Sequence, residues 1–370
     1  MATDGYRSIL TIDLGAVVEN FRRLRRAAEG SEVAAVVKAN GYGLGAVEIA
    51  GALWDEGCKS FFVAHPGEGL ELRERLPQAA IYVLNGLPAG AEAEIFDARL
   101  IPILNHPKEL ERYAALARRL ERRLPAALQI DTGMCRLGFS AREVEAIDRA
   151  PIAALDLQLV MSHLACAEEG SNPLNGLQRE RFERLRQRLP AVRASFANSS
   201  GIFLGPAYRL DLCRPGVALY GVNPTPGQPN PMAPVVTLEA PVLQVREVSE
   251  AGSVGYGATY AIGPGARIAT VPVGYADGYL RAASNRATAR IGGRDVPVAG
   301  RISMDLITLD VSTLPQDTIH PGVMVELIGG SDGVDGLAAA AGTIGYEVLT
   351  RLGSRFNRRY IRPGSTKHTS

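Results

Sequence analysis

Residues 33–46 read VAAVVKANGYGLGA, a short apolar run that ends in a lysine and leads into closely spaced glycines. A run of small and β-branched residues without a charge is typical of a strand buried on both faces, as in a parallel sheet. Gly41, Gly43 and Gly45 allow close backbone approach and open a helix, a layout suited to anionic groups. The stretch predicts a strand, a tight turn and a helix, with Lys38 at the end of the strand.

The same alternation continues through the first two thirds of the chain. Further strands are predicted at 61–64, 81–85, 100–104, 126–131, 156–162, 194–198 and about 209–221. Helices are predicted between them at 16–29, 45–56, 107–123 and 174–189, where apolar residues recur every three or four positions. Eight apolar strands alternating with helices predict an N-terminal α/β domain with the (β/α)8, TIM-like barrel fold.

The pattern changes at residues 223–234, which read NPTPGQPNPMAP and make a natural linker. Strand-like segments with glycine turns follow, and one helical stretch at about 341–353 interrupts them. We therefore expect a barrel over 11–230 and a mainly β C-terminal domain over 231–370. Residues 1–10 are expected to pair with the second domain.

Composition narrows the class of protein. The 370 residues carry a net charge of +1, with 46% hydrophobic and 21% charged residues, which is typical of a globular protein. Such a balance argues against a partner that is nucleic acid or an anionic membrane. The four cysteines form no CxxC pair, so neither a metal site nor a disulfide framework is expected. The chain shows no signal peptide and no membrane span, and we expect it to be cytoplasmic.

Lysine is scarce, since the sequence has 36 arginines but only four lysines. Lys59 precedes a strand, Lys108 starts a helix and Lys367 lies in the C-terminal tail. Lys38 alone ends a buried strand, where catalytic groups of a barrel are placed. A lysine in this position serves either as a salt-bridge partner or as an amine that forms a Schiff base once desolvation lowers its pKa.

Other nucleotide-binding and catalytic motifs fit poorly. GYGLGA lacks the third glycine of a dinucleotide fingerprint at the required offset, and the next strand ends in His65 instead of an acidic residue. The chain has no HExxH, GxSxG or SxxK motif.

From VVKANGYGLGA onward the sequence resembles the bacterial alanine racemases, which are pyridoxal-phosphate enzymes with a barrel followed by a β domain. Eight further segments match the family in the same order. They are DTGMCRLGF (131–139), MSHLACAEE (161–169), ANSSGIF (197–203), CRPGVALYG (213–221), VGYGATY (254–260), VPVGYADGY (271–279), AGRISMD (299–305) and TIGYEVLTRLG (343–353). The resemblance covers essentially the whole chain and implies interconversion of L-alanine and D-alanine, which supplies D-alanine for peptidoglycan.

The resemblance also implies roles for particular residues. Lys38 would hold pyridoxal phosphate and then act as one base, while Tyr256 would be the other. Because a free phenol has a pKa of about 10, Tyr256 needs nearby cationic groups, which the family supplies through His163 linked to Arg214. Arg136 would contact the cofactor phenolate and the substrate carboxylate. The remaining matched positions are Tyr42, Ser199, Gly216, Val217 and Tyr346 for the phosphate, the Met304 backbone for the carboxylate and Asp305 at the mouth of the site.

Arg214 would face the pyridine nitrogen of the cofactor. A guanidinium does not give up its proton, so this nitrogen would stay unprotonated, which makes the ring a poorer electron sink and limits transamination. In the family, Tyr256 and Met304 reach the site from the other subunit, which implies a head-to-tail homodimer with shared active sites.

One position departs from the family pattern. Many members have a carbamylated lysine seven residues before the loop arginine, whereas this chain has Gln129. A neutral amide can accept a hydrogen bond from Arg136 but offers no charge. We expect Arg136 to be held more loosely or by another acceptor. Cys135 is interpreted as a small buried filler in preference to a reactive thiol.

Three other functions fit parts of the sequence less closely. A broader-specificity racemase is the nearest, although Tyr346 and the Met304 segment favour a small side chain. A non-catalytic pyridoxal-phosphate carrier would not need a second domain that supplies a base. An amino-acid decarboxylase of similar architecture fits the VGYGATY segment less well.

Overall fold

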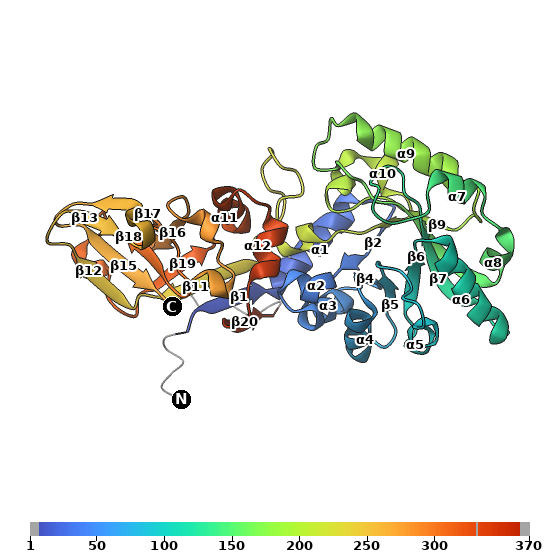
Figure 1. Cartoon of the computed structure of the whole chain (residues 1–370), viewed down its shortest axis with the longest axis horizontal. Coiled ribbons are helices and arrows are strands. Elements are labelled where there is room, and N and C mark those ends of the chain that lie inside the picture. Colours follow the sequence, from blue (N-terminus) through green and yellow to red (C-terminus); the bar gives the residue numbers. More distant parts are fainter. Residues whose placement is uncertain (1–6, 331, 363–370) are drawn as a thin grey trace. The chain divides into compact units, whose positions relative to one another are not determined.

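The computed structural model describes residues 7–330 and 332–362 (Figure 1). The described chain divides into two compact units. The barrel unit comprises Val17–Leu219 and Asn223–Met232, and the β unit comprises the residues up to Ala16, Tyr220–Val222 and the residues from Ala233 onward.

A parallel sheet forms the core of the barrel unit, in the order β2-β10-β9-β8-β7-β6-β5-β4-β3. The strands are β2 (Glu32–Val33), β3 (Ala35–Val36), β4 (Ser60–Val63), β5 (Ala80–Val83), β6 (Ile101–Leu104), β7 (Leu124–Gln129), β8 (Leu155–Met161), β9 (Arg193–Ser195) and β10 (Leu212–Cys213). β2 and β3 are separated by Ala34 alone and pair with opposite edges of the sheet, so that one continuous stretch closes the barrel.

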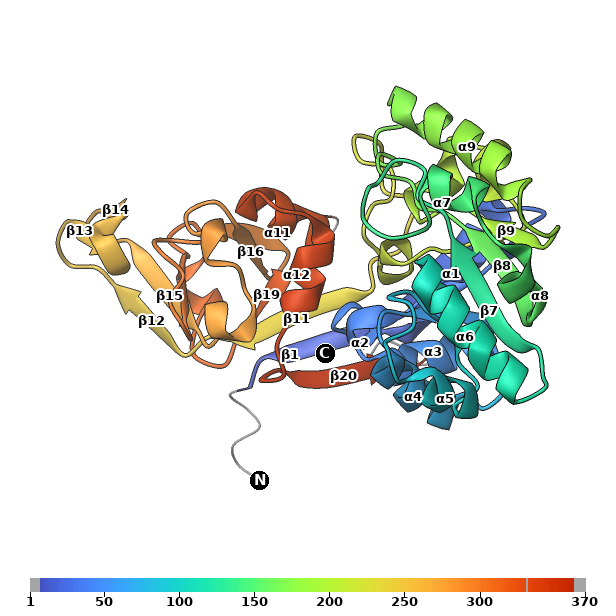
Figure 2. The same ribbon diagram turned by 45° about the vertical axis from the view of Figure 1, so that its right-hand side comes forward.

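Helices surround this sheet (Figure 2). They are α1 (Leu14–Ala27), α2 (Lys38–Tyr42), α3 (Ala46–Asp55), α4 (Pro66–Arg75), α5 (Glu92–Asp97), α6 (Pro107–Arg119), α7 (Ala141–Glu145), α8 (Arg149–Ala153), α9 (Pro173–Arg186) and α10 (Pro206–Arg209). Proline at the first position and a side-chain cap begin α9, where Asn172 accepts the N–H of Leu174 at 3.0 Å. Stacked rings such as Phe62 and Tyr82, 4.6 Å apart, fill the space around the strands.

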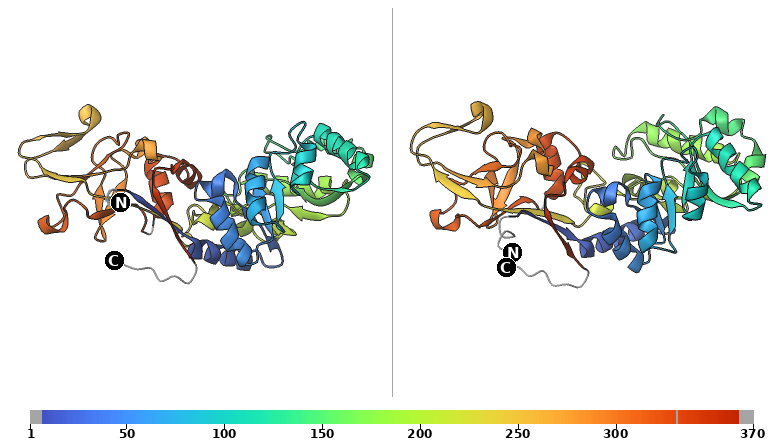
Figure 3. Two further views of the ribbon diagram at one scale, coloured as in Figure 1. Left: turned by 90° about the horizontal axis from the view of Figure 1, so that it is seen from below. Right: turned by 60° about the horizontal axis from the view of Figure 1, so that its bottom comes forward.

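The β unit is built on a second sheet, in the order β17-β16-β19-β11-β1-β20. Its strands are β1 (Ile9–Asp13), β11 (Val236–Pro241), β16 (Thr288–Ile291), β17 (Arg294–Pro297), β19 (Met324–Ile328) and β20 (Asn357–Ile361). β12 (Gln244–Glu247), β15 (Arg267–Val271) and β18 (Ile307–Asp310) make a smaller sheet, and β13 (Gly252–Val254) pairs with β14 (Tyr260–Ile262). α11 (Gly333–Ala341) and α12 (Gly345–Arg351) also belong to this unit, whose yellow to red segments are seen from below in the left view of Figure 3.

This architecture confirms the predicted barrel followed by a mainly β domain. Of the strand predicted over about 209–221, only Leu212–Cys213 forms a strand, because Arg209 ends α10 and Val217–Tyr220 forms a 3-10 turn, η3. The apolar residues there reflect burial alone, since periodicity cannot separate a short buried strand from a buried turn.

Lys367 lies outside the described residues. None of the helices in the described ranges combines the length and apolarity needed to cross a membrane.

β1 is the strand on which the β unit depends, because it lies between β11, antiparallel, and β20, parallel. Leu10 in its centre is fully buried. We expect Leu10→Ala to destabilise the protein by about 2–5 kcal/mol, since it leaves a cavity in the core. Urea unfolding measures this loss, with Leu120→Ala as the control because Leu120 is 38% exposed. Equal effects of the two substitutions would contradict a core role for Leu10.

Candidate functional site

Lys38 begins a turn of unusual backbone conformation at the end of β3. Ala39, Asn40, Gly41 and Tyr42 all have φ between 52° and 61°, in the left-handed region. This region costs roughly 1–2 kcal/mol for each residue with a Cβ. Such strain persists only where the surroundings over-determine it, and it clusters at functional sites.

Side-chain and backbone contacts close the turn onto the following helix. The side chain of Asn40 accepts the N–H of Ala46 at 2.9 Å, where α3 begins. A Cβ on Gly41 would lie 3.1 Å from the backbone nitrogen of Ala46, so this position requires glycine both for space and for its φ of 61°. The sequence Asn-Gly-Tyr-Gly after Lys38 is therefore a packed left-handed turn that joins the strand to α3.

The amine of Lys38 is half-buried beside charged groups. Burial lowers its pKa, and the positive charge of Arg136 lowers it further, while the carboxylate of Glu68 acts in the opposite direction. A lowered pKa increases the neutral, nucleophilic fraction of the amine.

Arg136 is carried by a loop between Asp131 and Phe139. One carboxylate oxygen of Asp131 accepts the N–H groups of Gly133, Met134 and Cys135 at 2.9, 2.9 and 3.2 Å, which shapes the loop. The guanidinium of Arg136 is exposed and makes no hydrogen bond or ion pair within the described chain. Its charge nevertheless acts on Lys38 and on His163.

Gln129 does not hold the guanidinium of Arg136. Its side-chain amide is buried and donates to the carbonyl of Leu137 at 3.0 Å, so it anchors the loop one residue beyond the arginine. Cys135 is exposed and has a φ of 55°, which makes its interpretation as a buried filler wrong.

His163 follows β8 and is held through its backbone. The side chain of Gln178, fully buried on α9, donates to the carbonyl of His163 at 2.9 Å and accepts the N–H of Ala165 at 2.8 Å. Burial, followed by the charges of Arg214, Arg136 and Lys38, lowers the pKa of His163 to about 3. The imidazole is therefore neutral at physiological pH.

Arg214 is a buried cation without a carboxylate partner in the described part of the chain. Its guanidinium donates to the hydroxyl of Ser195 and, at 2.6 Å, to the carbonyl of Ser162. Burial lowers its pKa to about 10, so it stays charged at neutral pH. Among the described residues it makes no hydrogen bond to the ring of His163, and it acts on that ring through its charge.

The loops after β9 and β10 meet at Ser199. Its hydroxyl accepts the N–H groups of Gly216 and Ala218 at 3.0 and 3.2 Å. A Cβ on Gly216 would lie 2.2 Å from the hydroxyl oxygen of Tyr42, so the absence of a side chain lets the phenol pack against this backbone. Val217 begins η3 directly after it. Tyr42 comes from the Lys38 turn, which links this cradle to the lysine.

The other three predicted site residues belong to the β unit. Tyr256 is 71% exposed on η4 (Tyr256–Ala258), between β13 and β14. Met304 is 54% exposed; its carbonyl accepts the N–H of Ala276 at 3.0 Å, and its own N–H donates no hydrogen bond within the described residues. Tyr346 lies on α12. Asp305, predicted at the mouth of the site, forms an ion pair with Arg355 at 2.8 Å.

Glu68, half-buried, and Gln178, buried, are two polar residues that contact the site loops and that the sequence did not predict. Both lie on helices rich in Arg and Glu, where a polar residue is usually solvated. On α9, Asn175 and Gln178 lie three positions apart and are both almost fully buried. The sequence alone does not show that this face of the helix is covered, so it could not single out either residue.

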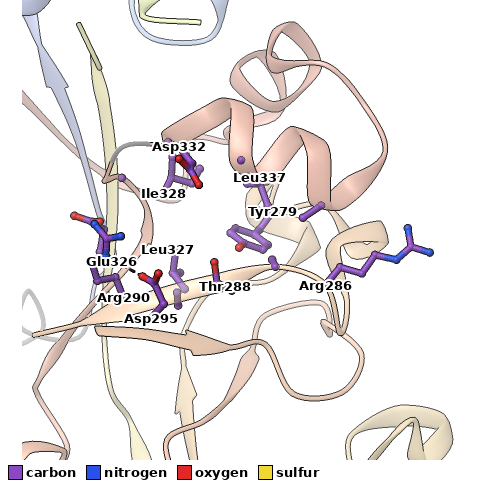
Figure 4. A pocket seen from close by; sticks show the side chains of 16 residues that line it. Tyr279, Arg286, Thr288, Arg290, Asp295, Glu326, Leu327, Ile328, Asp332 and Leu337 are labelled. Atoms are coloured by element: carbon purple, nitrogen blue, oxygen red, sulfur yellow. Dashed lines mark hydrogen bonds and ion pairs between the residues drawn. The ribbon is translucent and has the colours of Figure 1, made fainter. Parts of the chain in front are cut away.

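A cavity of about 150 Å³ in the β unit is lined by none of the predicted site residues (Figure 4). The ion pair between Arg290 and Asp295, at 2.9 Å, borders it together with Glu326, while the side chain of Arg286 extends away from it. Among the described residues, no cluster of His, Cys, Asp and Glu could hold a metal ion. Of the predicted site residues, Lys38, Arg136, His163 and Arg214 belong to the barrel unit.

Two family models match the chain. Residues 12–224 match "Alanine racemase, N-terminal domain" and residues 235–360 match "Alanine racemase, C-terminal domain". The alanine racemase of Rhodospirillum rubrum is 50% identical over 98% of both chains, and the catabolic alanine racemase of Mesorhizobium japonicum is 52% identical over 96% of this chain and 93% of that protein.

Solved structures agree with these matches. Alanine racemase from Bartonella henselae, with covalently bound pyridoxal phosphate, has a TM-score of 0.92 at 40% identity and covers 96% of this chain and 99% of that one. The biosynthetic alanine racemase of Pseudomonas aeruginosa has a TM-score of 0.88 at 37% identity, with the same coverage. The chain therefore belongs to the alanine racemase family.

Proposed function

We propose that the chain interconverts L-alanine and D-alanine, with pyridoxal phosphate held at Lys38. The observation that carries the proposal is the position of Lys38, a half-buried amine of lowered pKa at a barrel strand end, beside Arg136 and His163. The family membership of nearly the whole chain supports the same reaction.

The residues present fit this cofactor. A phosphate needs hydroxyl or N–H donors at a place where backbone can approach, and the cradle brings the hydroxyls of Ser199 and Tyr42 to the backbone of Gly216. Its aldehyde needs a neutral amine, which the lowered pKa of Lys38 favours. We propose that Val217 and Tyr346 complete the phosphate site, and that Arg214 faces the pyridine nitrogen.

When bound, pyridoxal phosphate supplies an electron sink for negative charge at the substrate Cα. Arg214 would tune this sink, because its guanidinium stays protonated with a pKa of about 10 and could only donate to a ring nitrogen. His163 stays neutral and adds no further cation beside Arg214.

Proton exchange on opposite faces of Cα needs two bases. We assign one to the amine of Lys38 and the other to the phenol of Tyr256. The guanidinium of Arg136 and the N–H of Met304 would bind the substrate carboxylate; both are free of other hydrogen bonds within the described residues. This assignment puts the two bases in different units of the chain.

The proposal includes a head-to-tail homodimer in which Tyr256 and Met304 serve the partner's Lys38 site. The exposure of both side chains is what such an arrangement requires. We further propose that the enzyme is cytoplasmic and that its D-alanine supplies peptidoglycan. The similar proteins include a catabolic and a biosynthetic alanine racemase. That this chain makes D-alanine for the cell, and does not break it down, is therefore part of the proposal.

Incubation of the purified protein with L-alanine in deuterated water tests the reaction. We expect Cα deuteration and D-alanine to appear with added pyridoxal phosphate, and Lys38→Arg to abolish both. Lys59→Arg is the matched control, because Lys59 lies over the Trp54 ring, 4.2 Å away. A cofactor-loaded protein without Cα exchange would instead be a carrier, and exchange with larger amino acids at equal rates would indicate a broad-specificity racemase.

Tyr256→Phe tests the two-base assignment. We expect proton removal from one enantiomer of alanine to fall by about 10²–10⁴-fold, the usual contribution of a positioned base, with a much smaller loss for the other. Tyr260→Phe is the control on the same hairpin, since its hydroxyl donates to Asp310 at 2.9 Å. Equal losses for both enantiomers would refute two distinct bases.

The pKa of His163 predicts a pH dependence of stability. The folded state titrates at about 3, whereas the unfolded chain titrates near 6.5. Between these values the unfolded chain binds the extra proton, so stability is retained above pH 6.5 and falls with pH below it, by up to about 1.4 kcal/mol per pH unit. Urea unfolding at pH 7.5 and 5.5 should show a weaker pH dependence in His163→Gln than in the wild type, at the same cofactor loading. Identical dependence in both proteins would contradict the buried neutral state.

A further inference from the structure

We propose that Glu68 is a positioning residue for Lys38: its carboxylate fixes the left-handed turn that follows the lysine. The inference rests on the proposed function, in which Lys38 carries the cofactor. Glu68 lies in the first turn of α4, the helix after β4.

The carboxylate of Glu68 joins two neighbouring strand ends. One oxygen accepts the N–H of Ala39 at 2.7 Å, and the other accepts the N–H groups of Ala64 and His65 at 2.7 and 3.2 Å. Ala39 follows β3, and Ala64 follows β4, its partner in the sheet. Each oxygen is thus committed to one strand end.

The turn needs this contact at its first residue. The first N–H groups of any helical turn lack partners inside the turn. Ala39 is also a residue with a Cβ held at a φ of 52°, a conformation that alanine avoids. A charged acceptor on its N–H holds the peptide between Lys38 and Ala39 in one orientation, and this peptide sets the direction in which the lysine side chain leaves the backbone.

Glu68 also contributes charge. It is the negative group acting on the Lys38 amine, against the positive charge of Arg136, while His163 nearby is neutral. Two substitutions separate the effect of the hydrogen bonds of Glu68 from the effect of its charge. Glu68→Asp keeps the charge but is too short to reach both strand ends, whereas Glu68→Gln keeps the length, loses the charge and has one acceptor oxygen instead of two.

The experiment uses the full-length protein with and without pyridoxal phosphate, and Glu71→Gln as the matched control. Glu71 lies three residues further along α4, is exposed, and makes no hydrogen bond or ion pair among the described residues. Three quantities are measured: hydrogen exchange of the Ala39 amide, the pH dependence of Lys38 labelling by an amine reagent in the cofactor-free protein, and the dissociation constant of pyridoxal phosphate.

We expect the Ala39 amide to be protected in the wild type and to exchange about tenfold faster in Glu68→Asp, the loss that follows removal of a charge-assisted hydrogen bond. Lys38 should be labelled at lower pH in Glu68→Gln than in the wild type, since loss of the carboxylate lowers the amine pKa. In both variants the dissociation constant of pyridoxal phosphate should rise about tenfold, and Glu71→Gln should match the wild type throughout.

The inference is overturned if Glu68 and Glu71 variants behave alike in Ala39 exchange and in Lys38 labelling. If the Glu68 variants do not fold, hydrogen exchange of the wild-type protein still tests the inference. A wild-type Ala39 amide that exchanges as fast as an unprotected amide would exclude its hydrogen bond to Glu68. Failure of the wild type to bind pyridoxal phosphate at Lys38 would refute the proposed function instead, and the two cofactor-free measurements would still test Glu68.

Discussion

The structure of the barrel unit depends on one stretch of backbone, residues 32–37, that hydrogen-bonds on both sides. Ala34 and Val36 donate to the carbonyls of Cys213 and Pro215, at 2.9 and 3.0 Å, and Val37 donates to the carbonyl of Phe62 at 2.9 Å. These bonds join the last strand to the first and so remove both edges of the sheet. Lys38 is the next residue after this stretch. The backbone that closes the barrel therefore also fixes the position of the lysine in the proposed site.

The site contains more positively charged side chains than negatively charged ones to balance them. Arg214 is buried on hydroxyl and carbonyl oxygens, and Arg136 is exposed on its loop. A buried cation without a carboxylate is costly, and here the cost appears as lowered pKa values of both Arg214 and His163. The imidazole is neutral chiefly because burial lowers its pKa, and the charges of Arg214, Arg136 and Lys38 lower it further. An anionic ligand bound among these groups would supply the missing negative charge.

The sequence predicted the fold well where burial and periodicity coincide, as in the strand before Lys38 and the helix over Pro107–Arg119. It failed for Val217–Tyr220, where an apolar run is a buried turn. The left-handed backbone at Ala39 was beyond prediction, because no local preference of alanine favours it and Glu68, 29 positions away, holds it. Position and residue type marked Lys38 as a candidate amine, whereas the roles of Arg136 and Tyr256 were predicted only through the family resemblance.

The β unit is assembled from the two ends of the chain. β1 receives β11 on one side and β20 on the other, and β20 is the last strand of the described chain. During synthesis the barrel strands emerge before β20. The barrel can therefore close on the ribosome while the edge of β1 that pairs with β20 is still unpaired. The unit that carries Tyr256 and Met304 is therefore completed only after the barrel strands have been synthesised.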